Sequence, residues 1–414
     1  MNQSVGNAPF FYTLSNGIRL IHKECYGEVS CCGLVVNAGS RHEQKNEQGL
    51  AHFLEHMLFK GTSHRNAANI LNNMERVGGE LNAYTTKEET FVYTLFLKKD
   101  YRRAIELVSD LFFNSTFPEE EIQKEREVIL DEINSFEDSP SDLIFDEFDQ
   151  WLFPANPIGH KILGEPDSLT SYTADSFRAF HQRLYTTDSI VFYSQAAIPA
   201  KRVVAMAEHF LGGIPATKRL SPETTQKPEP AKGFYQAVHK ETHQAHVICG
   251  NAGFSLYEED RLALYFLNNI LGGPGMNSRL NLALREHTGL VYSVESNVTS
   301  FTDSGVFSIY FGTDPDQVDR CLSIMNKELR KIREIPFTDR QLSAARQQLF
   351  GQILIASENK ENQTLGMGKS MLYFNAYDSM EEIIRKIEYI TSAKLTEIAC
   401  QVLDPDKLSL LIYK

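Results

Sequence analysis

Residues 52–56 of this chain read HFLEH, inside a stretch from 48 to 60 whose apolar spacing predicts a helix. His52 and His56 are four residues apart, so one turn of helix places both imidazoles on the same face. Glu55 stands between them, close to whatever they hold. Two neutral imidazoles suit Zn²⁺, and a neighbouring carboxylate that is not a ligand can act as general base on a zinc-activated water. The same residues also fit the hydrated side of an ordinary amphipathic helix.

A catalytic zinc site needs three protein ligands and an open position, so two histidines leave one ligand to be found. A helix predicted over residues 118–136 supplies two candidates, Glu125 and Glu132, whose spacing of seven places them on one face. Glutamates on a helix usually form its solvated side. Residue type and spacing alone therefore favour the solvated side and leave the third ligand open.

The bulk composition describes an ordinary globular protein of two to three domains. The 414 residues are 42% hydrophobic and 23% charged, and no apolar run approaches the roughly 20 residues that span a bilayer. The formal net charge of −13 argues against a nucleic-acid partner. Neither a secretory signal nor a CxxC pair is visible among the residues. We expect a cytoplasmic protein with free thiols and no membrane segment.

The chain divides near its middle into two halves that echo each other. Residues 214–232 carry four prolines and few apolar side chains, which is typical of a linker. The tripeptides HKE at 22–24 and NAG at 37–39 recur in the same order at 239–241 and 251–253. The colinear matches predict a duplicated α+β domain over 1–213 and 233–414, joined by this linker.

Strands and helices alternate within the first half. The helical patterns cover residues 48–60, 65–77, 101–113 and 118–136. The strand patterns cover residues 29–37, 81–84 and 91–97. This order favours a sheet in each domain with helices packed on one face.

Five longer motifs give the chain a resemblance to a known family. They read GLAHFLEHMLFKGT (49–62), GGELNAYTTKEET (78–90), KEREVILDEI (124–133), LGGPGMNSRL (271–280) and LREHTGLVYSV (284–294). In these motifs the chain resembles the pitrilysin-type inverzincin metallopeptidases, whose signature is His-x-x-Glu-His. It is most similar to the subgroup of the mitochondrial processing peptidase β-subunit and its bacterial relatives. The resemblance implies two homologous α+β domains, each an antiparallel-rich mixed sheet with helices on one face.

The resemblance also implies a role for each residue of a zinc site. His52, His56 and Glu132 would be the ligands of one Zn²⁺ per chain, because the family places its third ligand at this distance from the second histidine. Glu55 would be the general base. Glu125 matches the family's other acidic position on that helix, where it would orient a ligand.

Substrate contacts are implied in both halves. Asn82 and Ala83 match the family strand whose backbone binds an extended peptide, while Arg285 and Tyr292 match an Arg/Tyr pair that stabilises the oxyanion. The resemblance therefore implies a zinc metalloendopeptidase acting on peptides or unfolded polypeptide segments. Its subgroup pairs two chains, which implies a homodimer in which one chain's Arg/Tyr pair faces the other's zinc.

Two other functions stay open from the sequence. The first is a non-catalytic assembly subunit, like the respiratory-complex core proteins of the same fold, although those typically lose a ligand or the base. The second is a catalytic subunit that is active only with a distinct partner. This chain keeps all four residues of the zinc site, which favours a peptidase.

Overall fold

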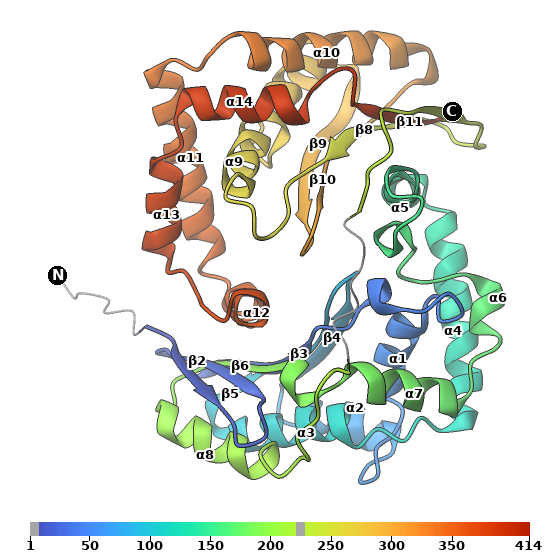
Figure 1. Ribbon diagram of the computed structural model, residues 1–414, viewed down its shortest axis with the longest axis vertical. Coiled ribbons are helices and arrows are strands. Elements are labelled where there is room, and N and C mark those ends of the chain that lie inside the picture. Colours follow the sequence, from blue (N-terminus) through green and yellow to red (C-terminus); the bar gives the residue numbers. More distant parts are fainter. Residues whose placement is uncertain (1–7, 221–227) are drawn as a thin grey trace. The chain divides into compact units, whose positions relative to one another are not determined.

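The computed structural model describes residues 8–220 and 228–414 as two compact units (Figure 1). Unit 1 comprises Met1–Ile133, Lys161–Thr224 and Ile355–Ser379. Unit 2 comprises Asn134–His160, Thr225–Leu354 and Met380–Lys414. The predicted linker at 214–232 includes residues 221–227, which lie outside the described part, as do residues 1–7. The two units interleave along the chain, and the division at this linker stays a prediction.

Unit 1 is built on a six-stranded mixed sheet. Its strands are β1 (Phe10–Thr13), β2 (Arg19–Glu24), β3 (Val29–Val36), β4 (Glu80–Thr85), β5 (Thr90–Leu97) and β6 (Ile190–Ala196). They lie in the order β1-β2-β6-β3-β5-β4, and only β2 and β6 run parallel. The predicted strands at 29–37, 81–84 and 91–97 are confirmed as β3, β4 and β5.

Most helices of unit 1 cover one face of this sheet. They are α1 (Leu50–Leu58), α2 (Ala67–Glu75), α3 (Tyr101–Phe113), α4 (Glu119–Glu137), α6 (Pro166–Leu169), α7 (Ala174–Leu184) and α8 (Ala200–Phe210). Short 3₁₀ turns of unit 1 lie at η1 (Ser40–His42), η2 (Lys98–Asp100) and η4 (Thr187–Ser189), whereas η3 (Pro157–Gly159) belongs to unit 2. The four predicted helices are confirmed as α1 to α4, with α3 at the predicted bounds. Alternate strand residues such as Leu34, Val92 and Phe192 enter the core with them because strand side chains have a period of two.

The opposite face of the same sheet is covered by one helix from late in the chain, α12 (Lys360–Phe374). Its Met367 and Met371 pack against the other set of strand side chains, which includes Val35, Phe91 and Tyr193. In Figure 1 this red helix stands beside the blue and green strands of unit 1. Unit 1 therefore buries both faces of its sheet, and the second face needs residues from the end of the sequence.

Two glycines in α12 allow the closeness of this packing to be tested. A Cβ at Gly368 would lie 2.6 Å from the fully buried ring of Tyr193, whereas a Cβ at Gly366 would meet nothing within 4 Å. We expect Gly368→Ala to lower the free energy of unfolding by about 1–3 kcal/mol through overpacking. Gly366→Ala is the matched control and should raise it by roughly 0.5–1 kcal/mol, because alanine favours helix. Urea unfolding followed by circular dichroism measures both, and equal effects would contradict the close contact.

Unit 2 repeats the architecture with a five-stranded mixed sheet. Its strands are β7 (Tyr235–Val238), β8 (Ala245–Ala252), β9 (Val291–Ser300), β10 (Gly305–Thr313) and β11 (Ser409–Tyr413). Its helices are α5 (Pro140–Leu152), α9 (Arg261–Gly272), the π-helix η5 (Asn281–Glu286), η6 (Pro315–Gln317), α10 (Val318–Glu334), α11 (Asp339–Ala356), α13 (Met380–Glu388) and α14 (Ser392–Val402). The order β7-β11-β8-β10-β9 matches β2-β6-β3-β5-β4 of unit 1, including the single parallel pair.

The matching strand orders confirm the predicted fold class, two homologous α+β domains. The structure adds a helix on the second face of each sheet. In unit 2 that helix is α5, whose Ile144, Phe148 and Leu152 pack against Ile248 and Leu411. The helix on the second face of unit 1, α12, thus comes from the second half of the sequence. The corresponding helix of unit 2, α5, comes from the first half.

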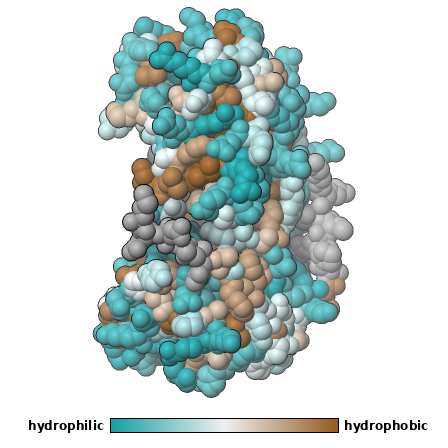
Figure 2. Space-filling view, turned by 90° about the vertical axis from the view of Figure 1, so that its left-hand side faces the viewer, coloured by the Kyte–Doolittle hydropathy of each residue, from teal (hydrophilic) through white to brown (hydrophobic). Residues whose placement is uncertain are grey.

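The described residues present no membrane-spanning element. No described helix combines the length and the apolar character needed to cross a bilayer. Figure 2 shows a mainly hydrophilic face on which hydrophobic residues gather in separate groups. Exposed large side chains include Tyr235, Tyr257 and Tyr292, each on unit 2.

Candidate metal centre

Helix α1 carries the two histidines because its other positions are core residues. Leu50, Phe53, Leu54 and Met57 are buried, so the remaining side of the helix presents His52 and His56. Their ring centroids lie 4.6 Å apart. His52 is 8% exposed, so the pair lies in a sheltered rather than a hydrated position.

The start of α1 is fixed by a glycine. Gly49 caps the helix with φ of 84°, in the left-handed region that favours glycine. A Cβ at this position would also lie 2.5 Å from the carbonyl oxygen of Leu163. The close approach of the two backbones therefore sets where the helix begins, and with it the direction in which His52 points.

Helix α4 brings the third candidate ligand to the histidines. Ile122, Ile129 and Ile133 anchor the helix in the core. Glu132 Oε2 lies 3.9 Å from His52 Nε2 and 3.8 Å from His56 Nε2. The structure thus brings Glu132 to the two histidines. Residue type and spacing alone had not decided whether this glutamate is a ligand or a solvated surface residue.

The three donor atoms fit a tetrahedral zinc ion. Ligand atoms of His52, His56 and Glu132 all lie within 4.8 Å of one another. Bond lengths near 2.1 Å place donors of one tetrahedral zinc about 3.4 Å apart, so small side-chain movements close the set. Two imidazoles and one carboxylate are also a donor set used by catalytic zinc, and the fourth position is left for water or substrate.

The protonation of His52 suits a ligand. Burial lowers the pKa of its imidazole to about 3, so the ring is neutral at physiological pH and keeps a lone pair for a metal. Its Nδ1 is buried and accepts or donates no hydrogen bond within the described residues. The lone pair available to a metal is that of Nε2, the ring nitrogen that lies 3.9 Å from Glu132 Oε2.

Glu125 orients the second histidine. Its Oε2 lies 3.5 Å from His56 Nδ1 and 2.7 Å from Lys60 Nζ. Burial favours a raised pKa for Glu125, but the bonds to His56 and Lys60 outweigh it and hold the pKa below its usual value. The carboxylate is therefore charged, and it fixes the His56 ring so that Nε2 faces Glu132.

Glu55 lies on the same helix as the two histidines, and it is not a member of the candidate metal-binding group. It is 8% exposed, and its Oε2 accepts a hydrogen bond of 2.9 Å from the Thr85 hydroxyl. Burial raises the pKa of Glu55, while Thr85 and His56 act in the opposite direction. A carboxylate with a raised pKa and a fixed orientation is a good proton acceptor near neutral pH.

Two residues of this site were not anticipated from the sequence, Lys60 and Thr85. Lys60 lies four residues after His56, so the helical period that paired the histidines also pointed to it. Thr85 ends the strand that contains Asn82 and Ala83, and nothing local indicates that its hydroxyl reaches Glu55. Both act on another side chain rather than on the metal.

The strand β4 that holds Asn82 and Ala83 forms one edge of the sheet in unit 1. It pairs with β5 through Asn82–Tyr93 and Ala83–Val92, and no described strand pairs with its other side. The unpaired side offers backbone donors and acceptors to an extended peptide. The strand also packs beside α1, so the edge lies near the histidines.

Arg285 and Tyr292 lie together in unit 2, whereas the histidines lie in unit 1. Arg285 lies in the last turn of η5 and Tyr292 is the second residue of β9, with the Arg285 guanidinium 5.9 Å from the centroid of the Tyr292 ring. Tyr292 is 83% exposed, so its hydroxyl is open to a ligand. The two residues are therefore neighbours in the structure, and their catalytic roles remain predictions.

Comparisons with known proteins agree with this geometry. Residues 19–165 match the insulinase family, also called peptidase family M16, and residues 171–349 match the M16 inactive domain. The chain is 33% identical to the uncharacterised zinc protease YmxG of Bacillus subtilis, with 97% of each chain covered. It is 34% identical to an uncharacterised zinc protease of Streptomyces coelicolor, over 94% of this chain and 86% of that one.

Solved structures share the fold as well. A protease from Helicobacter pylori superposes with a TM-score of 0.92 at 19% identity, covering 99% of this chain and all of that one. An M16 inactive-domain protein from Pseudomonas fluorescens gives a TM-score of 0.91 at 20% identity. At these identities the likeness concerns the fold alone. The zinc-binding pattern falls in the half of the chain that matches the peptidase model.

Proposed function

The chain belongs to the M16 family of zinc peptidases, and from that premise we propose that it is an endopeptidase that cleaves peptides or unfolded polypeptide segments. The observation that carries the proposal is the meeting of His52, His56 and Glu132 from two helices, with Glu55 held beside them. A bound Zn²⁺ supplies a water of lowered pKa and polarises the scissile carbonyl. We also propose that, within this family, the chain belongs to the subgroup of the processing-peptidase β-subunit and its bacterial relatives.

The chain's own residues complete the chemistry. Glu55 accepts a proton from the attacking water and then delivers it to the leaving amine nitrogen. The free side of β4 at Asn82 and Ala83 holds the substrate as an added strand, which requires an extended peptide and little sequence preference. A folded substrate cannot pair in this way, so the expected substrates are peptides and unfolded segments.

A cleavage assay with metal analysis tests this function directly. The purified chain should hydrolyse a quenched peptide, lose activity in a chelator and regain it with Zn²⁺, with about one zinc per chain. Zinc binding without cleavage would favour a subunit that needs a distinct partner. Absence of both would favour a non-catalytic assembly protein.

The hydrogen bond from Thr85 to Glu55 gives a second test of the site. We expect Thr85→Val to lower kcat about tenfold, because Glu55 loses the hydroxyl donor that helps to fix its orientation. Zinc content should not change, since Thr85 contacts no ligand. Thr85→Ser keeps the hydroxyl and should recover most of the rate. If Thr85→Val and Thr85→Ser lose activity equally, the role of Thr85 is in packing and not in its hydrogen bond to Glu55.

We further propose that two copies of the chain form a chamber with two composite sites. In each site Tyr292 of one chain would donate a hydrogen bond to the substrate oxyanion, beside His52, His56 and Glu132 of the other chain. Arg285 would orient that tyrosine. The support is that one chain carries both elements and that Tyr292 is largely exposed. A closed twofold arrangement then uses each element once.

Mixing two inactive variants distinguishes composite sites from self-contained ones. Glu55→Gln and Tyr292→Phe each impair every site in their own homodimer. After subunit exchange, a mixed dimer has one intact site if the tyrosine acts on the partner, which restores about a quarter of the wild-type rate. If both residues act within one chain, mixing restores nothing. Activity of a strictly monomeric species in light scattering would also contradict the composite site.

A further inference from the structure

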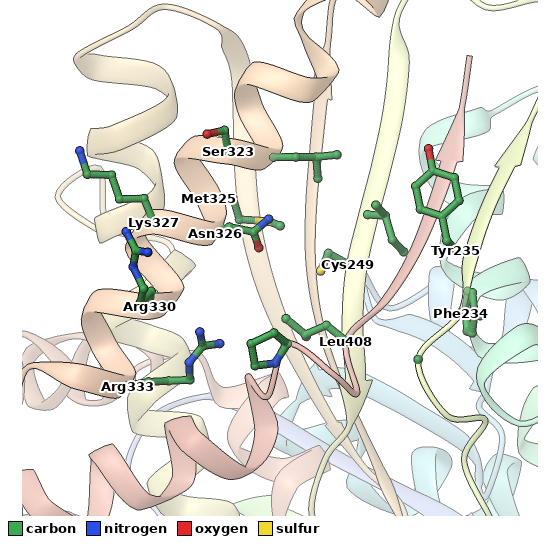
Figure 3. A pocket seen from close by; sticks show the side chains of 14 residues that line it. Phe234, Tyr235, Cys249, Ser323, Met325, Asn326, Lys327, Arg330, Arg333 and Leu408 are labelled. Carbon is green, nitrogen blue, oxygen red and sulfur yellow. The ribbon is translucent and has the colours of Figure 1, made fainter.

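A groove of about 760 Å³ lies in unit 2 between α10 and the strands β7, β11 and β8 (Figure 3). It is outside the set of residues that form the metal centre. Figure 3 shows three basic side chains rising from α10 on one side and Tyr235 standing on the strands opposite. Met325, Cys249 and Leu408 lie between them and form the floor.

The lining combines an apolar floor with a basic rim. Lys327, Arg330 and Arg333 line the groove, and no carboxylate is among its lining residues, although the chain carries a net charge of −13. Lys327 and Arg330 are exposed. Arg333 donates to the Leu403 carbonyl oxygen, which fixes its guanidinium at the end of the rim. Such a surface selects an occupant with apolar groups and negative charge.

Unit 1 shows what occupies the equivalent place in the duplicated fold. There α8 packs against α3 and β2, the counterparts of α10 and β7, and it buries Val203 and Ala207 in the core. The Ser109 hydroxyl of α3 donates a 2.9 Å hydrogen bond to the carbonyl oxygen of Phe210 at the end of α8. The sheet and helix of this fold therefore accept one more amphipathic helix at this position.

The same surface is open in unit 2. Asn326 occupies the position in α10 that Ser109 occupies in α3, and it is exposed in the groove. Within the described part of the chain, no helix packs across α10 and β7. Tyr235 at the start of β7 is 64% exposed. The groove thus lies at the place in the duplicated fold that α8 covers in unit 1, and three basic side chains line it.

We propose that this groove binds an amphipathic helix of another protein, with its apolar side on the strands and acidic residues facing Lys327, Arg330 and Arg333. The helix would take the place that α8 takes in unit 1. Its carboxylates would face Lys327 and Arg330 above all, since Arg333 already interacts with Asp404 beside the groove. The inference concerns unit 2 alone and does not depend on the peptidase chemistry of unit 1.

A peptide based on α8 serves as the probe. The probe is a labelled peptide with the sequence of residues 200–211, extended by alanines for helicity, in which Lys201 and Arg202 are replaced by glutamate. The unchanged sequence is the control, since it has the same apolar side and opposite charge. Fluorescence anisotropy measures binding to the full chain, which carries Glu55→Gln so that the probe is not consumed. We expect the acidic peptide to bind about tenfold more tightly than the basic one.

Charge reversal in the groove locates the binding. The double variant Lys327→Glu, Arg330→Glu should weaken binding of the acidic peptide about tenfold. Arg320→Glu is the matched control, because Arg320 is an exposed base on α10 outside the groove and should have no effect. In the chain that retains Glu55, both variants should keep full peptidase activity. Equal binding of the two peptides, or equal effects of the two variants, overturns the proposal.

Two further outcomes would assign the groove to another occupant. If inorganic phosphate displaces the acidic peptide completely at matched ionic strength, the groove is a small-anion site. If light scattering shows self-association that the double variant abolishes, the occupant is a second copy of this chain. Either result overturns the proposal of a partner helix.

Discussion

Glu55→Gln should lower kcat for peptide cleavage by about three orders of magnitude while leaving zinc content unchanged, because glutamine keeps the shape of the side chain but cannot accept the proton. Glu55 is not among the three groups that can hold the ion, His52, His56 and Glu132. Glutamine also keeps an oxygen for the Thr85 hydroxyl, so the local structure is preserved. Metal analysis and single-turnover cleavage of the same preparation measure both quantities.

The two readouts of this variant separate the possible roles of Glu55. Retention of near-full turnover would remove it from the reaction altogether. Loss of zinc together with activity would make it a ligand or a support for one. Only loss of turnover with retained zinc agrees with a general base. KM should change little, because the strand that we propose to bind substrate is untouched.

Glu132→Ala should remove the metal and the activity together. Loss of one of three protein donors leaves two imidazoles on one helix, which hold zinc far more weakly, by at least about a hundredfold in affinity. The neighbouring Asp131 supplies a matched control, since it is an exposed carboxylate on the same helix and belongs to no metal-binding group. Asp131→Ala should bind zinc normally.

Zinc titration of the apoprotein measures this difference without any assay of cleavage. Excess Zn²⁺ should restore part of the activity of Glu132→Ala, because the base and the histidines remain in place. A variant that keeps one tightly bound zinc would show that Glu132 belongs to the solvated side of α4 after all. The result would then direct attention to Glu125, the other carboxylate near His56.

The parts of the site that were predictable are those encoded within one helix or by a long motif. The spacing of His52, Glu55 and His56 gave their shared face, and the position of Glu132 followed from the family resemblance. Thr85 was not predictable, because its partner Glu55 lies on another element and the contact depends on how β4 packs beside α1. Side-chain contacts between distant elements leave no local periodicity.

The fold was predictable for similar reasons and with a similar limit. Strands such as β3 and β5 and the helix α3 have clear periodicity, and the repeated tripeptides revealed the duplication. The position of α12 was not foreseen. Its partners Val35 and Tyr193 lie far earlier in the chain, and its sequence contains Gly366 and Gly368, which weaken a helical pattern. Packing on a distant sheet, rather than local propensity, decides where this helix lies.

The place of α12 has a consequence for how the protein is made. A ribosome completes the sheet of unit 1 at Ala196, but the helix that covers its second face emerges only after Phe374. At about 5–20 residues per second, synthesis from Ala196 to Phe374 takes roughly ten to forty seconds. During this time side chains such as Val35, Phe91 and Tyr193 are not covered by α12. The nascent first half therefore holds His52, His56 and Glu132 while one face of its sheet is still uncovered, and we expect chaperones to bind it during synthesis.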